Sequence, residues 1–307
     1  MIGYQALRTS CAWRDMSARG RIKVTGEDRA RLLHAMTTNH IQQLTPGQGC
    51  YAYFLNAVGR ILADVNVFCR PDHFLLDTEP ETHDKVYQHL DKFIIADDAT
   101  LEDLTPVTAI IALDGPESHE ILRGLGAPIP EEAHANAEWG TRLIARVSYV
   151  GGPGYIVFAP ASEAPGLIQE LESAGASSAD EEASNIVRLE NGKPRYGQDL
   201  SERYLAQEAN QPQALHFNKG CYLGQEIVER VRSRGQVHRV LMPLQMDVAE
   251  PPAPGTKLQI DGKDAAEITS AAFSPALNKV VALAYVRTEF ADRTVFSPSF
   301  EAVAKPT

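Results

Sequence analysis

The sequence predicts an α+β fold, in which helices pack on antiparallel sheets, followed by an all-β segment. Strand patterns and helical patterns follow one another through the first part of the chain, whereas residues 256–304 carry short β runs and little helical periodicity. We therefore expect a body over residues 1–240, built from two interleaved α+β subdomains, and a small C-terminal β-barrel over residues 241–307.

The first elements expected are a strand, a helix and a hairpin. Residues 20–24 alternate apolar and polar side chains, and residues 27–38 carry an apolar stripe at helical spacing. Two strands follow over residues 50–56 and 60–68, joined at Gly59. Regular alternation in the second strand predicts two faces: Ile61, Ala63, Val65 and Val67 on one, and Leu62, Asp64, Asn66 and Phe68 on the other.

A strand over residues 74–77 and a helix over residues 80–94 complete this unit. The order strand, glycine, acidic residue, helix occurs in IKVTGEDRARLL and again in IIALDGPESHEIL, which indicates a duplicated βα unit. Two further strands are expected over residues 141–158, and a helix runs through residues 186–189. The Pro-rich stretch 250–255 separates the body from the β-rich end.

Composition excludes several classes of function. The chain has 29 Lys+Arg against 40 Asp+Glu, a formal net charge of −11 at pH 7, and 44% hydrophobic residues. The hydrophobic content is that of a globular protein, which excludes a mainly disordered chain. The negative excess disfavours nucleic acid and anionic membranes as partners, because the long-range field has the wrong sign. A small anion can still bind at a local basic patch.

The cysteines and the N-terminal residues bear on the compartment. The four cysteines Cys11, Cys50, Cys69 and Cys221 form no CxxC pair, so neither a zinc knuckle nor a local iron–sulfur cluster motif is indicated. The first twenty residues contain no apolar signal-peptide core, and no stretch has the roughly 18 apolar residues of a membrane span. We expect a cytoplasmic monomer.

The densest candidate site is the run Lys219-Gly220-Cys221-Tyr222-Leu223-Gly224-Gln225-Glu226. Two glycines four positions apart allow close backbone approach, and a neighbouring lysine favours the reactive thiolate of an exposed cysteine. If the next segment is extended, Arg230, Arg232 and Arg234 share one face as a basic stripe. The alternative is a loop at a helix start, with a buried structural cysteine and solvated arginines.

KGCYLGQE, continued by IVERVRSRG, resembles the signature of the YgfZ-type folate-binding proteins, which belong to the superfamily of the glycine-cleavage T-protein, an aminomethyltransferase. GRIKVTGEDRARLLHAMTTNHI resembles the opening strand and helix of that family, and YAYFLNAVGRILADVNVF resembles its hairpin. RLENGKPRYGQDL resembles the RxEAGxxxYGxD segment of the superfamily. These segments fall within residues 20–240.

The resemblance implies a body that binds tetrahydrofolate in a central cavity, with the small β-barrel on top. YgfZ-like proteins support the maturation or repair of iron–sulfur enzymes, including one that modifies tRNA. The implied partners are therefore iron–sulfur client enzymes or assembly proteins. Cys221 takes the position of the functional cysteine of the family, and Lys219, Tyr222, Gln225 and Glu226 match the rest of the motif.

T-proteins carry an acidic pair in a GGxxDD hairpin segment, and only the second acid is kept here, as Asp64. Between the apolar neighbours Leu62 and Phe68, a carboxylate has a raised pKa, which suits a hydrogen-bond donor to a pterin ring or a general acid or base. The alternative is an edge-strand aspartate that faces water.

Two departures from the T-protein pattern argue against aminomethyl transfer. The acids of a GEDGxE-like segment are missing from residues 151–156, GGPGYI, and the matching T-protein motif has no cysteine at position 221. Arg188 matches the arginine of the RxEAG segment and is expected to contact the ligand. Its alternative is a surface salt bridge with a neighbouring glutamate.

Other side chains are candidates for folate contacts. Arg230 and Arg232 are expected to pair with the anionic glutamate tail. The candidate aromatic walls of the pteridine are Tyr51, Tyr53 and Tyr222, with core packing as the alternative for the two hairpin tyrosines. The histidines show no metal-binding spacing, and surface positions are expected for His34, His40, His83, His89 and His134.

The leading hypothesis is a YgfZ-type folate-binding accessory protein for iron–sulfur enzymes, with Cys221 as the functional thiol. The first rival is a tetrahydrofolate-dependent aminomethyl or one-carbon transferase that uses Asp64. The second rival, a nucleic-acid-binding module, is disfavoured by the net charge and by the lack of an aromatic and basic binding sheet.

Overall fold

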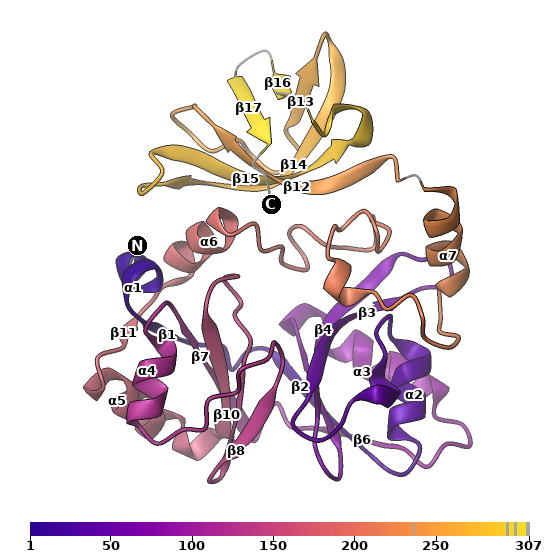
Figure 1. Ribbon diagram of the computed structural model, residues 1–307, viewed down its shortest axis with the longest axis vertical. Helices are drawn as coiled ribbons and strands as arrows, with labels where there is room; N and C mark the ends of the chain where they lie inside the picture. The colour runs from indigo at the N-terminus through magenta and orange to yellow at the C-terminus, as the bar shows by residue number, and fades with distance from the viewer. Residues whose placement is uncertain (236, 293–294, 298–299, 305–307) are drawn as a thin grey trace.

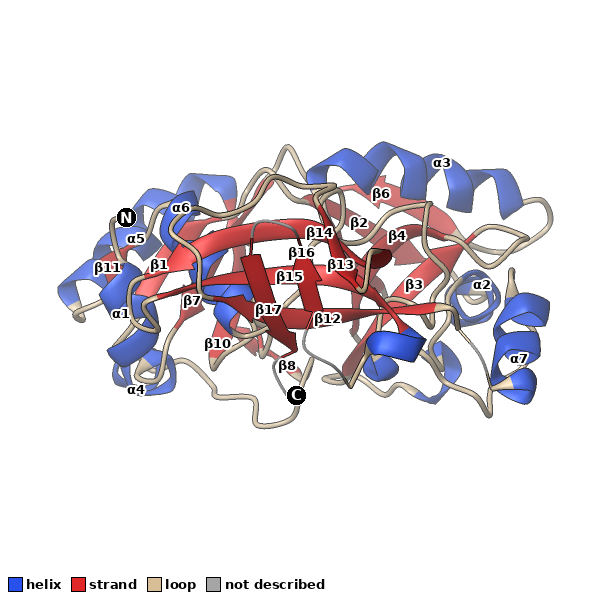
Figure 2. Ribbon diagram, turned by 90° about the horizontal axis from the view of Figure 1, so that it is seen from above, coloured by secondary structure: helices blue, strands red, loops and turns tan. Residues whose placement is uncertain are grey.

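Three β-sheets organise the chain in the computed structural model, which describes residues 1–235, 237–292, 295–297 and 300–304. Two lobes, each a sheet with its helices, lie side by side, and a closed barrel sits above both (Figure 1). Seen from above, the barrel lies across the junction of the two lobes (Figure 2). The prediction of an α+β body with a C-terminal barrel is confirmed.

The first lobe holds a five-stranded antiparallel sheet. Its strands in spatial order are β3 (Gly49–Leu55), β4 (Ile61–Cys69), β5 (Phe74–Thr78), β2 (Gly20–Thr25) and β6 (Thr100–Asp103). Its helices are α2 (Arg29–Met36) and α3 (His83–Phe93), with the 3-10 turns η1 (Ile41–Gln43) and η2 (Pro80–Thr82). The expected strand, helix and hairpin are therefore present.

The second lobe holds a six-stranded sheet. Its strands in spatial order are β11 (Ser177–Ser178), β1 (Ala12–Asp15), β7 (Thr108–Asp114), β10 (Gly154–Pro160), β9 (Arg142–Ala145) and β8 (Asn136–Trp139). Its helical segments are α1 (Tyr4–Thr9), α4 (Ser118–Gly124), η3 (Ala161–Glu163), α5 (Ala164–Ser173) and α6 (Glu181–Glu190). Strand β1 precedes β2 along the chain but pairs with β7, so the N-terminal segment crosses between the lobes.

The echoed strand–glycine–helix segments take the same form in both lobes. Gly26 follows β2 with φ 97° and leads into α2, and Gly115 follows β7 with φ 124° and leads into α4. A β-carbon on Gly26 would lie 2.1 Å from the carbonyl oxygen of Asp98. The glycine at this turn is therefore required both by the backbone conformation and by space.

The barrel closes in the order β12-β15-β14-β13-β16-β17. Its strands are β12 (Arg239–Met246), β13 (Lys257–Ile260), β14 (Lys263–Ser274), β15 (Lys279–Arg287), β16 (Val295–Ser297) and β17 (Phe300–Ala304), with the turn η5 (Thr288–Phe290). The turn η4 (Pro212–Ala214) and helix α7 (Gln225–Arg234) lie between body and barrel along the chain. None of the described helices is long and apolar enough to cross a membrane.

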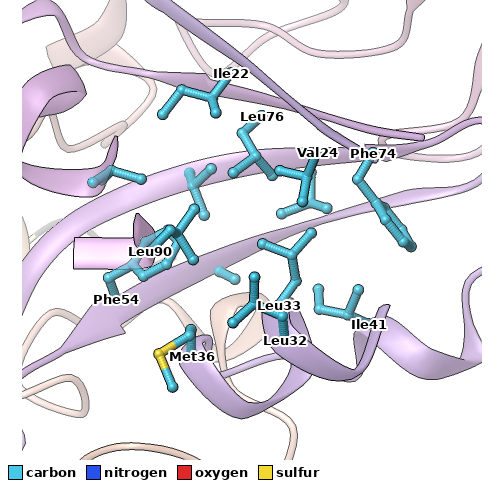
Figure 3. Close-up of a cluster of buried hydrophobic side chains, with 14 of the residues drawn as sticks. Ile22, Val24, Leu32, Leu33, Met36, Ile41, Phe54, Phe74, Leu76 and Leu90 are labelled. Atoms are coloured by element: carbon cyan, nitrogen blue, oxygen red, sulfur yellow. The ribbon is translucent and has the colours of Figure 1, made fainter. Parts of the chain in front are cut away.

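Each lobe has its own apolar core, and a third cluster joins the two. Leu33 of α2 and Leu90 of α3 are fully buried against the five-stranded sheet, as Figure 3 shows. Between the sheets, the rings of Phe68 and Phe158 meet edge to face at 5.5 Å. This shared core holds the two sheets at a fixed separation, on which the geometry of any site between them depends.

The strand β4 departs from regular alternation at its start. A register shift between Phe54 and Leu55 of β3 makes Leu62 the extra residue of a bulge, so that Asp64 lies opposite Tyr53 and Ile61 lies opposite Leu55. Leu62 consequently packs on the helical side of the sheet, and Ile61 packs on the side of the tyrosines. The faces predicted for these two residues are therefore wrong, because a bulge inverts the side-chain alternation.

Candidate functional site

A cavity lies between the two lobes and beneath α6. Its lining comes from strands of both sheets, from the loop 147–150, from α6 and from the segment that follows α6. The lining residues are Arg14, Met16, Arg19, Tyr51, Asp64, Asn66, Glu79, Val147, Ser148, Tyr149, Val150, Glu181, Ser184, Asn185, Arg188, Lys193, Pro194 and Arg195. We call it the central cavity. It joins polar side chains that are far apart in sequence.

Asp64 of β4 is a buried carboxylate of the central cavity. Its Oδ2 accepts a hydrogen bond of 2.7 Å from the Tyr51 hydroxyl, while its Oδ1 is buried without a hydrogen-bond partner among the described residues. Burial, reinforced by the charge of Glu79, raises the pKa of Asp64 to about 6. The raised pKa is as predicted, but the surroundings are polar groups of an enclosed cavity rather than Leu62. The alternative of a water-facing edge position is wrong, since β4 lies between β3 and β5.

A buried ion cluster forms one wall of the central cavity. The Arg19 guanidinium donates to Asp77 at 2.7 Å and also to Glu79, and Arg195 lies 3.3 Å from Glu79. Burial by itself would raise the pKa of Glu79, but Arg19 and Arg195 outweigh it and lower that pKa. Tyr149 donates to Asp77 at 2.8 Å, and Arg19 lies over its ring at 4.2 Å. The cluster is paired throughout, which fixes the cavity wall.

Arg188 lines the central cavity, but its guanidinium is used within the protein. It donates to Asp199 at 2.8 Å, to Asn185 at 2.9 Å and to the carbonyl of Lys193 at 3.1 Å, and also to Gln198. The alternative of a surface salt bridge with a neighbouring glutamate is therefore wrong, because the partner is the buried Asp199. Ligand contact by Arg188 stays a prediction, and its contacts make it a residue that positions the segment 193–199 below α6.

A second cavity, with a volume of about 510 Å³, adjoins the first. The two share Val147, Ser148 and Lys193 as lining residues. The other residues of the second cavity are Ala133, His134, Arg146, Gly151, Gly152, Pro153, Gly154, Asn191, Gly192, Gln211 and Gln213. Lys193 thus lies where the two cavities meet, with its ammonium 5.2 Å from the centre of the Tyr51 ring.

His134 is held in an unusual conformation at this second cavity. Its φ is 62°, in the left-handed region that residues other than glycine rarely adopt. Its Nε2 lies 3.1 Å from Oδ1 of Asn66, and burial lowers its pKa to about 4. The surface position expected for His34 is wrong, because this residue is buried on the inner face of α2, and His134 is half-buried.

The motif Lys219–Glu226 lies outside the central cavity. Cys221 is exposed, whereas Cys11 and Cys69 are buried and Cys50 is half-buried. The Lys219 ammonium donates to three carbonyls within or just after α2: that of His34 at 2.6 Å, that of Asn39 at 2.8 Å, and that of Thr37. Because all three donors of the ammonium are used there, the expected stabilisation of a Cys221 thiolate has no free donor to carry it. The exposure of Cys221 also rules out the alternative of a buried structural cysteine.

The glycines and polar residues of the motif shape the start of α7. Gly224 has φ 86°, and a β-carbon there would lie 2.7 Å from the carbonyl oxygen of Asn56. Gln225 accepts the backbone N–H of Tyr222 at 3.2 Å, and Glu226 is exposed in the first turn of α7. Gly220 has no such conformation and leaves a β-carbon 3.5 Å from Nε2 of His34. Gly224 is therefore the position where the motif requires a glycine.

The predicted basic stripe is not formed. Residues 225–234 are helix α7, so side chains two positions apart point to nearly opposite sides of the helix. Arg230 and Arg232 are exposed, and Arg232 pairs with Glu229 at 3.6 Å and lies over the Phe217 ring. Neither residue lines the central cavity or its neighbour. The side chain of Arg234 lies outside the described part of the chain.

Tyrosines divide between the cavity and the core. Tyr51 lines the central cavity as expected, whereas Tyr53 is fully buried in an apolar cluster beneath the barrel. Tyr222 packs on that same cluster and lines neither cavity. The prediction of an aromatic wall therefore finds support in the position of Tyr51 alone among these three.

Several cavity residues carried no recognisable signal in the sequence. Arg14, Arg19 and Arg146 stand in no motif, and His134 lies in a loop without regular periodicity. Lys193 lies inside RLENGKPRYGQDL, so the resemblance of that segment to RxEAGxxxYGxD was a pointer to it. Among the residues that the structure describes, no group of three His, Cys, Asp or Glu side chains is arranged to hold a metal ion.

Comparison with known proteins shows which family has this fold. Residues 3–219 match the GCVT N-terminal domain, and residues 239–300 match the glycine cleavage T-protein C-terminal barrel domain. The chain belongs to the glycine-cleavage T-protein family. The aminomethyltransferase of Rubrobacter xylanophilus is 30% identical over 93% of this chain and 78% of that protein. The aminomethyltransferase of Streptomyces coelicolor is 31% identical over 92% of this chain and 79% of that protein.

A solved structure of the T-protein family shares the fold, and a plant protein is similar in sequence. The glycine cleavage system aminomethyltransferase T from Bartonella henselae superposes with a TM-score of 0.90 at 22% identity, covering 99% of this chain and 87% of that one. A chloroplastic protein of Arabidopsis thaliana is 29% identical over 83% of this chain, which spans 60% of its length. The two matched T-protein domains leave out residues 220–238, which hold Cys221 and all of α7.

Proposed function

We propose that the chain binds tetrahydrofolate in the central cavity, with Asp64 as the acid that faces the ligand. Members of the T-protein family use tetrahydrofolate as substrate or cofactor. The observation that carries the proposal is the buried Oδ1 of Asp64, which has no hydrogen-bond partner among the described residues. A buried polar atom of this kind costs free energy unless a ligand or water satisfies it.

The residues present fit a pterin ring, which offers both donors and acceptors. Besides Oδ1 of Asp64, the Nε of Arg14 is buried in the cavity lining without a partner among the described residues, while its Nη2 pairs with Asp114 at 3.2 Å. One orphaned carboxyl oxygen and one orphaned N–H therefore belong to residues that line the same cavity. Tyr51 adds an aromatic surface beside them.

In this proposal the side chains of the cavity bind and orient the ligand. Bound tetrahydrofolate would supply the carrier for a one-carbon unit. Tyr51 holds Asp64 by its hydroxyl, and Asp64, with a pKa of about 6, can hold or accept a proton near neutral pH. The paired cluster of Arg19, Asp77 and Glu79 keeps the wall in place without offering a free charge.

We propose further that the chain is a YgfZ-type accessory protein that supports iron–sulfur enzymes, with Cys221 as its functional thiol. The motif KGCYLGQE supports this assignment, together with the exposure of Cys221 where two of the other three cysteines are buried. Gly224, which packs on the β3–β4 hairpin, and the buried Lys219, which is bonded to α2, hold the loop, so the thiol is presented on a defined backbone.

A second candidate is a tetrahydrofolate-dependent aminomethyltransferase, which the retained Asp64 favours. Its pKa of about 6 suits proton transfer in such a reaction. Against it, the loop 151–154 carries no carboxylate. Release of methylenetetrahydrofolate from an aminomethyl-loaded carrier protein would establish the transferase, and its absence in the presence of folate binding would favour the accessory role.

Calorimetry with tetrahydrofolate tests the ligand. We expect saturable binding to the wild type, and at least tenfold weaker binding to Asp64→Asn, since the amide cannot share a proton with the ligand. Asp72→Asn is the matched control, because Asp72 is exposed in the turn after β4 and contacts only His73 among its described ion-pair partners. No heat with the folded wild type at high ligand concentration would exclude the folate assignment.

Complementation tests the thiol. In a strain that lacks its own YgfZ-type protein, Cys221→Ser should lose support of iron–sulfur enzyme activity, while Cys50→Ala keeps it. Native alkylation with iodoacetamide should label Cys221 first and leave the buried Cys11 and Cys69 unlabelled. Full support by Cys221→Ser, with normal protein levels, would remove this thiol from the function.

A further inference from the structure

Lys193 is a half-buried amine without an acidic partner. Three other lysines pair with carboxylates: Lys23, Lys85 and Lys257. Lys193 lines both cavities, yet no hydrogen bond or ion pair joins its ammonium to a described residue. Its ammonium faces the ring of Tyr51, whose centre is 5.2 Å away. The amine is therefore available to a ligand that enters either cavity.

The backbone at the end of α6 fixes the root of the Lys193 side chain. Gly192 follows the helix with φ 66°, and the N–H of Lys193 donates to the carbonyl of Arg188 at 2.8 Å. The Lys193 carbonyl in turn accepts from the Arg188 guanidinium at 3.1 Å. A β-carbon on Gly151 would lie 2.9 Å from Cβ of Lys193, so the backbone at Gly151 packs against this root. The side chain therefore starts from a defined point where the two cavities meet.

Burial makes the amine of Lys193 easier to deprotonate. Desolvation is the largest effect on its pKa and lowers it, and the charge of Arg19 lowers it further. Three carboxyls act in the opposite direction: those of Asp64, Glu79 and Asp114. The pKa of Lys193 nevertheless lies below the ordinary value of 10.5. The neutral amine is the form of lysine that attacks carbonyl carbons, and desolvation is one of the ways in which proteins obtain it.

The second cavity adds a site for an anionic group beside this amine. Arg146 lines the cavity and has no ion-pair partner among the described residues, and no aspartate or glutamate belongs to the lining. Asn191, Gln211 and Gln213 supply amide groups. The volume of about 510 Å³ lies within the range of roughly 300–1,000 Å³ that small-molecule sites occupy. A ligand carboxylate would therefore meet a cation and amide donors in the same cavity as the amine.

We propose that Lys193 is a Schiff-base site for a small oxo acid, whose carbonyl carbon bonds to the Lys193 nitrogen while its carboxylate pairs with Arg146. This goes beyond the proposed function and does not require folate. The lone pair of the neutral amine adds to the carbonyl carbon, and the Asp64 carboxyl, which lines the central cavity with Lys193, donates a proton to the carbonyl oxygen. The carboxylate then takes a proton from the nitrogen and returns it to the oxygen, which leaves as water while the C=N bond forms. The iminium cation so formed keeps its positive charge beside the Tyr51 ring.

Reductive trapping on the full chain tests the amine. Glyoxylate is the probe oxo acid, and cyanoborohydride reduces the C=N bond, which leaves a carboxymethyl group on the lysine. Near pH 7, peptide mass spectrometry should show labelling of Lys193 at least about tenfold faster than labelling of Lys92, because each unit by which a lysine pKa is lowered raises the neutral fraction about tenfold. Lys92 is exposed on α3 and lines neither cavity. Lys193→Gln should lose this adduct, and Lys92→Gln should keep it. Equal rates at the two lysines, or no adduct on Lys193, would overturn the proposal.

A neutral aldehyde tests the site for the carboxylate. Acetaldehyde has the aldehyde group of glyoxylate without its charge. In Arg146→Gln, labelling of Lys193 by glyoxylate should slow at least about threefold, while labelling by acetaldehyde stays at the wild-type rate, which also shows that the variant is folded around Lys193. Arg123→Gln is the matched control, since Arg123 is exposed on α4 and lines neither cavity. An unchanged glyoxylate rate in Arg146→Gln would overturn the oxo acid as the ligand class.

Discussion

The central cavity and the cysteine loop are built in opposite ways. The cavity gathers side chains from strands of both sheets, from α6 and from the segment after it, and it encloses Asp64 with an orphaned oxygen. The cysteine loop, residues 219–226, is one continuous stretch of sequence that presents Cys221 at the surface. The T-protein domain matches cover the first region and stop at Lys219, just before Cys221.

The difference shows that burial determines the chemistry of the cavity, whereas backbone conformation determines the geometry of the loop. In the cavity, burial disfavours the charged carboxylate, so the pKa of Asp64 is raised, and a buried cation such as Arg19 must be paired. On the loop, Lys219 is buried and bonded to backbone carbonyls, whereas Glu226 is solvated and contributes little, and backbone conformation decides the geometry, as at Gly224. The following substitutions should therefore have large electrostatic effects in the cavity and small or steric effects at the loop.

Arg188→Ala should give the largest loss of stability. It leaves Asp199 buried without its cationic partner, although Thr269 and Ser270 still donate to that carboxylate, each at 2.5 Å. We expect a loss of about 3 kcal/mol in the free energy of unfolding, measured by urea denaturation. Arg123→Ala, the exposed control, should change it by no more than about 0.5 kcal/mol. Unchanged stability with weakened folate binding would instead make Arg188 a ligand contact.

Asp64→Asn should stabilise the protein at neutral pH while it weakens folate binding. The folded pKa of about 6 lies above the ordinary 3.8, so the folded state holds more protons than the unfolded state between these values, and stability falls as pH rises through that window. The variant avoids this loss, which amounts to about 3 kcal/mol above pH 6. The difference in unfolding free energy between variant and wild type should be small near pH 4 and level off above pH 6. A difference independent of pH would contradict the raised pKa.

Local patterns in the sequence were enough to predict most elements of the body. The strand–helix–hairpin order up to β4, the helix α6 and the β-rich end all follow from periodicity and turn residues. Strand β1 is only four residues long and pairs with β7 about a hundred positions away, so no local pattern indicates it. The bulge at Leu62 is likewise a property of the pairing of two strands rather than of either one.

The candidate site was predicted in part. Asp64 and Tyr51 of the central cavity were predicted because the resemblance located the hairpin. Arg146 and His134 line the second cavity from loop positions that tertiary packing sets, so they were not predicted. The sequence around α7 does contain helix-start and helix-end residues, which the prediction of an extended basic stripe overlooked. Gly224 precedes the helix and Gly235 follows it, both in the left-handed conformation, with Glu226 in the first turn.

Gly224→Ala and Gly220→Ala should separate the two glycines of the motif. At Gly224 the alanine is strained by φ 86° and crowds the carbonyl of Asn56 and the side chain of Leu55, which should cost about 1–2 kcal/mol. At Gly220 the alanine fits, so stability should be unchanged within about 0.5 kcal/mol. Thermal unfolding and the rate of Cys221 alkylation measure both effects. An equal loss in the two variants would mean that loop dynamics rather than the backbone conformation of Gly224 fixes the thiol.

Arg230→Gln and Arg232→Gln should have the smallest effects, and they test the separation of the two regions directly. Arg230 has no ion-pair partner among the described residues, and the pair of Arg232 with Glu229 is exposed, so stability should change by less than about 0.5 kcal/mol. Affinity for tetrahydrofolate should stay within twofold of the wild type, because neither side chain lines the central cavity or the second cavity. A loss of tetrahydrofolate affinity in these variants would place part of the ligand along α7. It would also make the cysteine loop part of the folate site, since α7 begins four residues after Cys221.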